Sequence, residues 1–588
     1  MRLSVFLVGF VVALGGAPPA YAGDPIMPLS QVQRGMSCTA YSVVQGTDIA
    51  AFRADVVDVV SGGSSAQILV RVSGPAVDAT GVGPGFSGSP IYCPDPQGTP
   101  RNIGAIAEGV GDYGNKLALV TPIEAILGEP VRPPAATRSA RRLLRSAHPL
   151  AAPLIITGLP RGVARAVEAA SRRAHHLVVP AAPAPSFGFA PQALRPGSAF
   201  AVGLSSGAIG LSAIGTVAYT DGATVWGFGH PLDGAGQRSL LLQDAYVYTV
   251  VNNPVGAADL STYKLAAAGH DLGTVSNDAP DGVVGSAGGL PPLIPLTIRA
   301  RDGDTGQVQS STTQLSDETA VDQPAGASAV ATVGPLAVAS AAENLLRGMP
   351  ANQSGSMCLR VSLRESARPL GFCNSYVEAG TGPGPSGTAI GAVESGMASD
   401  LSDAAALIDA YDVQTLHVTG LSVTMTLRRG LRQASILSAK APPIVRPGSR
   451  LRVRLLVRRR RGPRQTIVVR ARVPVGLRPG PQTLTLSGVP TDDESSTASA
   501  IPSIVAALTG SSTSGKPDTS PPESIPELAH AVAGIRRFDG VIASFGAPRR
   551  RGRTRASGQL VYRDPELRIL GAAQVDLLVK PVRRGKRR

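Results

Sequence analysis

Glycine and proline interrupt this chain so often that long helices have little room to form. The 588 residues include 68 glycines and 50 prolines, and both residue types break helices and mark the turns between strands. Short runs rich in Val, Ile and Leu, such as 53–60 and 67–73, lie between them. Hydrophobic residues still make up 43% of the chain, which is enough to bury several cores. The pattern predicts a mainly β protein, and the length predicts more than one domain.

The first residues are typical of an export signal. Arg2 provides a positive start, residues 3–15 form an apolar run, and Ala20-Tyr21-Ala22 is a cleavage site with small residues at both ends. The apolar run is shorter than the roughly 20 residues that a membrane-spanning helix needs. We therefore expect cleavage near Ala22 and a mature protein that is secreted or held at the cell envelope.

Four cysteines fit this exported location. They are Cys38, Cys93, Cys358 and Cys373, and an even number in an exported chain predicts disulfides. Proximity along the chain favours Cys38–Cys93 and Cys358–Cys373, although four cysteines allow three pairings. The sequence has no Cys-x-x-Cys or His-x-x-x-His spacing, so we expect no structural metal site.

The chain is basic, with a formal charge of +15. The arginines gather in three runs, Arg458–Arg461, Arg549–Arg551 and Arg583–Arg588. One interpretation is that the basic tail attracts an anionic polymer or lipid surface of the envelope. The other is a solvated hairpin tip and a disordered tail. We expect no nucleic-acid partner, because no aromatic residues interleave the runs to stack on bases.

The segment 85–90, Gly-Phe-Ser-Gly-Ser-Pro, has the chemistry of a nucleophile loop. A serine nucleophile needs a tight turn that exposes its oxygen, and N–H groups that converge on the oxyanion. Glycines on both sides of Ser87 permit such a backbone. The segment resembles the Gly-Asp-Ser-Gly-Gly-Pro loop of chymotrypsin-like peptidases. This resemblance implies that Ser87 is the nucleophile and that the N–H groups of Gly85 and Ser87 form the oxyanion hole.

A serine nucleophile needs a base, and His230 is the best-placed histidine. It follows a predicted hairpin of strands 214–219 and 224–228, on a loop where a sheet can aim its ring. A structural histidine that caps a turn is the alternative. The other histidines carry no comparable motif, being in linker segments, an Ala-rich stretch, a predicted sandwich strand and the tail: His148, His175, His176, His270, His417 and His530.

Several segments together resemble the SpoIVB sporulation peptidase family. They are 85–90, Gly215-Thr216-Val217 and Phe228-Gly229-His230-Pro231, supported by 28–47 and 121–124. The resemblance covers about residues 24–300 and implies a trypsin-like double β-barrel that acts on a protein or peptide without a cofactor. Here Ser87 precedes His230, so the two barrels would stand in permuted order, which triad chemistry allows because geometry defines it.

The sequence leaves the third catalytic member open. Asp78, Asp221, Asp233 and Asp244 are candidates, but no motif distinguishes any of them. A turn or surface role explains each one as well, and Asp221 belongs to an Asp-Gly turn signal. We assign no acid, and a Ser–His dyad is a further possibility.

The expected architecture is a permuted trypsin-like double β-barrel followed by a β-sandwich accessory region. Strong alternation of apolar and polar residues in 451–455 and 469–473 indicates a half-buried antiparallel sheet. The predicted boundaries are a signal peptide (1–22), a Ser-bearing half (23–130), a linker with a short strand and a helix (131–197), a His-bearing half (198–300), a connecting segment with a helix (301–350), a β-sandwich (351–491), a flexible linker (492–526) and a C-terminal region with a basic tail (527–588).

Two functions are compatible with these observations. The first is an exported serine endopeptidase of the SpoIVB type, with Ser87 as nucleophile and His230 as base. The second is a non-catalytic scaffold or binding protein of the cell envelope that is built on the same fold. Hydrogen-bond reach between Ser87 and His230 distinguishes them.

Overall fold

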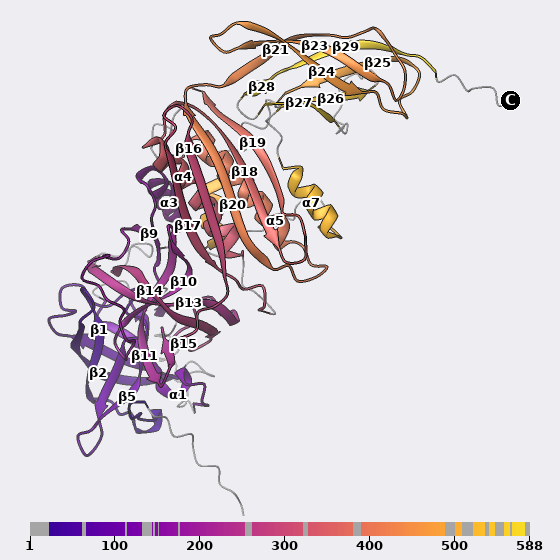
Figure 1. Cartoon of the computed structure of the whole chain (residues 1–588). Coiled ribbons are helices and arrows are strands. Elements are labelled where there is room, and N and C mark those ends of the chain that lie inside the picture. The colour runs from indigo at the N-terminus through magenta and orange to yellow at the C-terminus, as the bar shows by residue number, and fades with distance from the viewer. Residues whose placement is uncertain are drawn as a thin grey trace, which may run out of the picture.

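Strands dominate the described part of the chain, as the sequence predicts. The computed structural model describes residues 23–61, 66–111, 115–131, 144, 147–150, 152–174, 177–252, 262–321, 327–379, 390–488, 500–508, 521–535, 540–546, 558–564 and 567–581. The predicted signal peptide lies outside the described residues. The chain builds a β-barrel, a second curled β-unit, a layer of strands and helices, and a β-sandwich at the far end (Figure 1).

The first unit is a closed barrel. Its strands pair in the order β1-β2-β3-β6-β5-β4, and β4 pairs back to β1. In β2, Phe52, Ala54 and Val56 are buried in the core. Arg53 and Asp55 alternate with them on the outer surface and form an ion pair at 2.8 Å, as period-2 patterning requires. The strands are β1 (Ser37–Val43), β2 (Ile49–Ser61), β3 (Ala66–Ser73), β4 (Pro90–Pro94), β5 (Pro100–Val110) and β6 (Leu117–Pro122).

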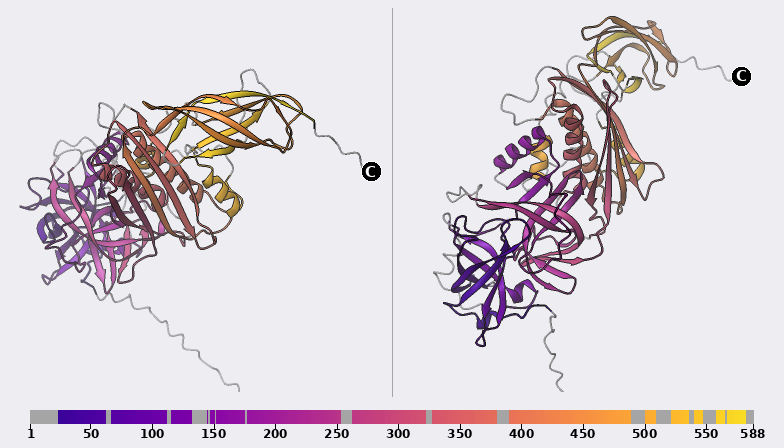
Figure 2. Two further views of the ribbon diagram at one scale, coloured as in Figure 1. Left: turned by 45° about the horizontal axis from the view of Figure 1, so that its top comes forward. Right: turned by 60° about the vertical axis from the view of Figure 1, so that its left-hand side comes forward.

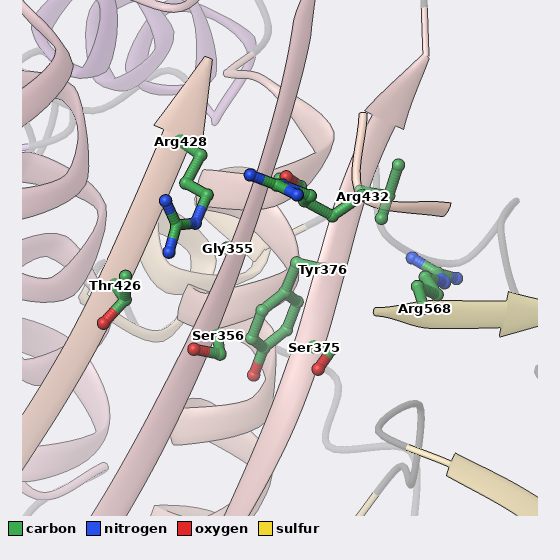
Figure 3. Close-up of a pocket in the computed structure, with 10 residues that line it drawn as sticks. Gly355, Ser356, Ser375, Tyr376, Thr426, Arg428, Arg432 and Arg568 are labelled. Carbon is green, nitrogen blue, oxygen red and sulfur yellow. The ribbon is translucent and has the colours of Figure 1, made fainter. Parts of the chain in front are cut away.

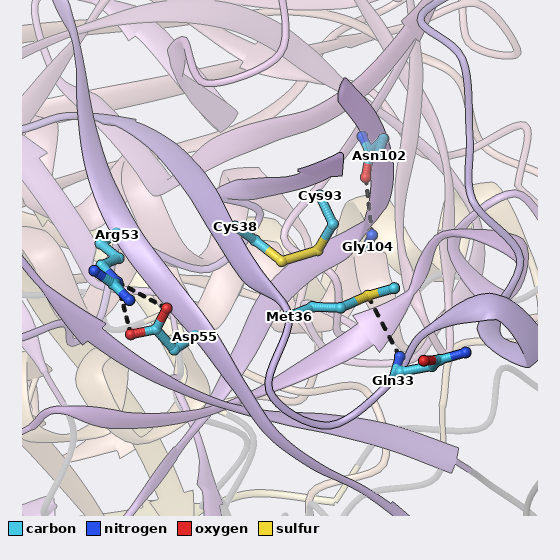
Figure 4. The surroundings of a disulfide bond; sticks show 8 residues. All are labelled: Gln33, Met36, Cys38, Arg53, Asp55, Cys93, Asn102 and Gly104. Carbon is cyan, nitrogen blue, oxygen red and sulfur yellow. Dashed lines mark hydrogen bonds and ion pairs between the residues drawn. A yellow bond between two sulfur atoms is a disulfide. The ribbon is translucent and has the colours of Figure 1, made fainter. Parts of the chain in front are cut away.

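The Cys38–Cys93 disulfide ties this barrel together, which confirms the predicted pairing (Figure 4). The two cysteines lie opposite each other on β1 and β4, next to the paired residues Thr39 and Tyr92. The bridge therefore fixes β4, the strand that directly follows the Ser87 loop.

The second unit is a curled sheet. Its pairings run β10-β13-β14-β15-β12-β11 and return to β10. Phe200 and Phe228 pack against each other in its core, with ring centroids 5.0 Å apart. The expected hairpin is β11–β12, with Asp221 paired to Thr224. The strands are β10 (Ala199–Gly207), β11 (Gly210–Asp221), β12 (Thr224–Gly227), β13 (Gly236–Val251), β14 (Tyr263–Ala279) and β15 (Gly282–Ala287).

The curled sheet continues into a large layer that helices cover. Strands β16, β17, β18, β19 and β20 extend it, and α4 and α5 pack on one face of these strands (Figure 2). Helix α4 is long and apolar enough to cross a membrane, but most of it is buried in this core. The elements are β16 (Leu293–Asp302), β17 (Val308–Ser316), α4 (Ala329–Leu346), β18 (Asn352–Leu363), β19 (Leu370–Ala379), α5 (Ala392–Asp409) and β20 (Val418–Arg429).

Smaller elements join the units. The predicted strand and helix of the 131–197 linker are β8 and α3, and buried Glu343 of α4 accepts the N–H groups of Gly162 and Val163 at the start of α3. The second predicted disulfide, Cys358–Cys373, is confirmed and joins β18 to β19. These smaller elements are η1 (Leu29–Gln31), α1 (Ile123–Ile126), β7 (Ala147–Pro149), β8 (Leu154–Thr157), α3 (Arg161–Ala174) and β9 (Val178–Ala181).

The β-sandwich begins later in the chain than the predicted boundary of 351. Strands β18 to β20 bury their apolar faces against α4 and α5 rather than against a second sheet, so they belong to the helix-covered layer. One sandwich sheet is β24-β23-β21-β28 and the other is β22-β29-β25-β26-β27. The strands are β21 (Gln433–Lys440), β22 (Ile444–Val445), β23 (Arg450–Arg459), β24 (Arg464–Arg472), β25 (Gly480–Ser487), β26 (Gly540–Gly546), β27 (Gln559–Arg563), β28 (Arg568–Leu570) and β29 (Ala572–Val579).

The end of the chain is also more ordered than expected in the residues that the structure describes. Helix α6 (Ala500–Leu508), inside the predicted linker 492–526, buries Ile501, Ile504 and Val505 in the core of the helix-covered layer. Helix α7 (Ile525–Ala533) follows, and β26 to β29 complete the sandwich. The basic runs Arg549–Arg551 and Arg583–Arg588 lie outside the described residues.

Candidate functional site

The fold brings the Ser87 and His230 loops into contact at the boundary between the two β-units. Gly88 donates its N–H to the Ile106 carbonyl of β5 at 2.8 Å. A methyl group on Gly229 would lie 3.4 Å from the same carbonyl oxygen, and one on Gly88 would lie 2.7 Å from the Phe228 nitrogen. The two predicted motifs, far apart in the sequence, therefore meet at one carbonyl group.

Local backbone geometry explains the glycines of the Ser87 loop. Gly85 and Gly88 adopt φ values of +93° and +91°, which side chains on L-residues rarely tolerate. A side chain at Gly88 would also collide with the Thr216 carbonyl oxygen of β11. Glycine at this position therefore lets the loop press against the second β-unit.

The N–H groups around Ser87 fall into two sets. Phe86, Gly88 and Ser89 donate to the carbonyl groups of Gly83, Ile106 and Phe86. Within the described residues, the N–H groups of Gly85 and Ser87 donate no hydrogen bond. These two are the groups that the sequence assigns to the oxyanion hole.

The Ser87 side chain is fully buried and makes no hydrogen bond within the described part of the chain. Residues 81–91 are buried throughout, so the loop is enclosed between the two units. The backbone carbonyl of Ser87 accepts the Thr216 N–H at 2.9 Å, which fastens the loop to β11. In this arrangement a substrate has no path to the hydroxyl group.

His230 lies close by, but its ring is engaged elsewhere. Its Nδ1 is 2.7 Å from the Pro231 carbonyl oxygen, and its Nε2 is 3.0 Å from the Leu150 carbonyl oxygen. Burial lowers the pKa of His230, which favours the neutral imidazole. A neutral ring can donate only one hydrogen bond, so one of its nitrogens faces a carbonyl oxygen unfavourably. The structure thus brings the two loops together without a hydrogen bond between Ser87 and His230.

A buried lysine that the sequence analysis did not identify lies at the same boundary between the two β-units, which is called the junction below. Lys264 of β14 donates to Ser42 Oγ at 2.8 Å and to Thr216 Oγ1 at 3.0 Å, and its Nζ lies 4.6 Å from the centre of the Phe86 ring. Ser89 Oγ donates to Ser42 Oγ at 2.9 Å. These contacts join both β-units to the Ser87 loop.

The amine of Lys264 has no carboxylate partner among the described residues. Complete burial lowers its pKa to about 7, because desolvation penalises the charged form. One sequence signal could have identified it: in β14, Lys264 and Ala266 share the buried face, where an apolar residue is expected.

The candidate acids lie apart from Ser87 and His230 in the hydrogen-bond network of the described residues. Asp78 pairs with Lys116, and Asp233 pairs with Arg238 at 2.8 Å. Asp221 ends β11 in the expected turn. Asp278, which the sequence analysis did not consider, accepts the N–H groups of Leu232 to Ala235 and so fixes the loop that follows His230.

Asp244, the fourth candidate, orients a different histidine. Its buried carboxylate accepts the backbone N–H of His270 at 2.6 Å and contacts the ring nitrogen Nδ1 of His270 at 3.0 Å. The ring of His270 is partly exposed and packs on Phe189 beside a pocket of about 230 Å³. The two residues meet because β13 and β14 pair, with Gln243 opposite Asp271.

A second pocket lies between the helix-covered layer and the sandwich. Arg428, Arg432 and Arg568 line it with Tyr376 (Figure 3). Its volume of about 20 Å³ is enough for a water molecule rather than a peptide. It is therefore a poor candidate for a substrate site.

No group of three or more His, Cys, Asp or Glu side chains in the described ranges could hold a metal ion. Comparisons with family models, curated protein sequences and solved structures gave no match to this chain. The function is therefore inferred from the residues themselves.

Proposed function

We propose that this chain is an exported serine endopeptidase of the SpoIVB type, with Ser87 as nucleophile and His230 as general base. The contact between the two motif loops at the Ile106 carbonyl is the observation that carries the proposal. The N–H groups of Gly85 and Ser87, which have no acceptor among the described residues, support it, because an oxyanion hole needs donors without other partners. The permuted trypsin-like arrangement of the two β-units belongs to the same proposal.

The proposed reaction proceeds in two stages and needs no cofactor. Ser87 Oγ attacks the carbonyl carbon of a protein or peptide bond while His230 takes its proton, and the N–H groups of Gly85 and Ser87 receive the oxyanion. His230 then passes the proton to the leaving amine. Water, activated by the same imidazole, hydrolyses the acyl-enzyme and restores the Ser87 hydroxyl group.

Reaction requires the junction to open, because residues 81–91 are buried. The neutral His230 ring faces two carbonyl oxygens and can satisfy only one of them, so the closed arrangement is under electrostatic strain. Rotation of the ring away from the Leu150 carbonyl would free Nε2 for Ser87. The proposal thus describes a latent enzyme whose activation consists of opening this junction.

A non-catalytic scaffold is the second candidate, and two observations favour it. The Ser87 hydroxyl is enclosed, and both nitrogens of His230 contact backbone carbonyl groups. In this case the loops would serve to join the two β-units, and the accessory regions would bind the partner.

Peptidase assays on matched serine variants distinguish the two candidates. Ser87→Ala should abolish cleavage of an unfolded protein substrate while leaving thermal stability unchanged, because Ser87 Oγ makes no hydrogen bond to any described residue. Ser89→Ala should keep measurable activity, since Pro90 restricts its backbone and suits it to supporting the loop. Ser276→Ala, on the exposed surface of β14, is the control and should match the wild type. Equal cleavage by Ser87→Ala and wild type would favour the scaffold.

A further inference from the structure

The outer face of one sandwich sheet carries a ladder of arginines. Alternate residues of β23 and β24 point outward, and seven exposed arginines lie among them. The antiparallel register sets three pairs directly opposite each other across the two strands. These pairs are Arg450–Arg472, Arg452–Arg470 and Arg458–Arg464. Arg454 is the seventh member, and the whole set is called the arginine face below.

No carboxylate in the described part of the chain neutralises this face. None of the seven guanidinium groups forms an ion pair with a described residue. Like charges directly opposite each other on paired strands are destabilising. An external anion would relieve this repulsion, so the charge of this face suits an anionic partner.

The opposite sheet of the same sandwich provides a contrast. On its outer face, Thr483 donates to Asp576 at 3.2 Å, and Thr485 lies opposite Gln574. Among the described strands of the sandwich, the positive charge is therefore concentrated on the outer face of one sheet. This asymmetry gives the domain one face suited to an anionic surface.

Apolar side chains interrupt the arginine face. Val468 lies opposite Arg454 and is 45% exposed, and Leu437 of the neighbouring strand β21 is 42% exposed. At the tip of the β23–β24 hairpin, Arg458–Arg461 line a pocket of about 540 Å³ with Ser435. An extended sheet face that combines guanidinium groups with exposed aliphatic groups suits a bilayer surface, which offers both phosphates and an apolar interior.

We propose that the arginine face docks the protein onto a bilayer rich in anionic phospholipid. The guanidinium groups would pair with headgroup phosphates, for which their planar donors are well suited. Leu437 and Val468 would enter the headgroup region. The face lies at the opposite end of the molecule from the barrel, so docking leaves the Ser87 junction clear of the membrane (Figure 1).

Vesicle sedimentation with the full mature chain tests this proposal. The wild type should bind phosphatidylcholine vesicles that contain phosphatidylglycerol, bind pure phosphatidylcholine vesicles far less, and lose affinity as salt rises. A variant with four substitutions should bind the anionic vesicles roughly a hundredfold or more weakly, given the contribution of each basic residue near such a surface. These substitutions are R450Q, R452Q, R470Q and R472Q.

A second variant controls for net charge, because it also loses four exposed arginines, from β16, β18 and the residue just after β18. It should bind as the wild type does, and its substitutions are R299Q, R301Q, R360Q and R364Q. Wild type that ignores anionic vesicles at low salt, or a four-substitution variant that binds like the control, would overturn the proposal. L437S/V468S should also weaken binding severalfold; unchanged vesicle affinity would contradict the entry of Leu437 and Val468 into the headgroup region.

Discussion

The junction between the two β-units and the arginine face of the sandwich both hold basic groups that have no acidic partner among the residues the structure describes. At the junction, Lys264 is fully buried, and desolvation lowers its pKa to about 7. On the arginine face, water solvates the guanidinium groups, and arginine stays charged at any ordinary pH. The amine at the junction can lose its charge by releasing a proton, whereas the charge of the arginine face can be neutralised only by a bound anion.

This difference separates the proposed tasks of the two regions. A buried amine held by Ser42 and Thr216 links the two β-units and makes the stability of their junction depend on pH. An exposed array with a fixed charge suits reversible attachment, which salt rather than pH should control. Each prediction below should therefore affect one region and leave the other unchanged.

The largest expected effect concerns His230. His230→Ala should lower kcat/KM on the order of 10,000-fold, as loss of the base does in serine peptidases. His270→Ala is the matched control, because His270 is another partly buried histidine of the same β-unit, held by Asp244 rather than by the carbonyl groups that contact His230. Kinetic assays of both variants show which of the two histidines acts as the base. If His270→Ala loses activity and His230→Ala keeps it, the reaction takes place at the 230 Å³ pocket.

Replacing the buried amine should change how stability depends on pH. The unfolded chain holds the Lys264 proton up to its ordinary pKa of 10.5, whereas the folded chain releases it near 7, so stability is lost as pH falls through this window. Lys264→Met removes this pH dependence. The free energy of unfolding of the variant should therefore rise, relative to that of the wild type, by about 4 kcal/mol from pH 10 to pH 7. Denaturant unfolding at both pH values measures this change, and a difference that does not vary with pH would mean that folding does not lower the pKa of Lys264.

The two disulfides should contribute unequally to stability, and neither lies in the arginine face. Cys38–Cys93 closes a loop of 55 residues beside the Ser87 junction, and Cys358–Cys373 closes one of 15 residues in the helix-covered layer. Chain entropy alone predicts losses of about 4 and about 3 kcal/mol for the two Cys→Ala pairs. Hydrogen exchange should show the first pair loosening β1 and β4 without affecting β23. Equal loosening of the sandwich would contradict the separation of the regions.

The smallest effect should appear on the arginine face. Arg470→Gln removes one of two opposed charges and should stabilise the sandwich by about 0.2–1 kcal/mol at low salt. The gain should shrink as salt rises, because solvent ions already screen exposed charges. Thermal unfolding at two salt concentrations measures it. Destabilisation by this substitution would indicate that Arg470 has a partner within the protein.

Some features of the fold follow directly from local patterns. The alternation in 451–455 and 469–473 predicted two strands that face a core, and these are β23 and β24. Chain proximity of the cysteines favoured the observed disulfides. Glycines on both sides of Ser87 anticipated the positive φ values of its loop. Each of these depends on neighbours in the sequence.

The remaining features depend on contacts between distant segments. Strands β18, β19 and β20 alternate like sandwich strands, but α4 and α5 cover them, and alternation does not distinguish a helix layer from a second sheet. The sandwich is completed by β26 to β29, of which β27 and β28 have only five and three residues, too few to show a period. The local sequence around Lys264 predicts a strand but not a buried amine, because only the packing of the two β-units removes that amine from water.

Reaction of the purified mature protein with a fluorophosphonate probe, followed by peptide mapping, tests the central proposal most directly. Because the loop is enclosed, labelling should be slow and should accelerate under mild denaturant or partial proteolysis that opens the junction. The adduct should map to Ser87, disappear in Ser87→Ala and persist in Ser276→Ala. Absence of labelling under every condition that keeps the protein folded, or an adduct on another serine, would contradict the peptidase and leave the scaffold.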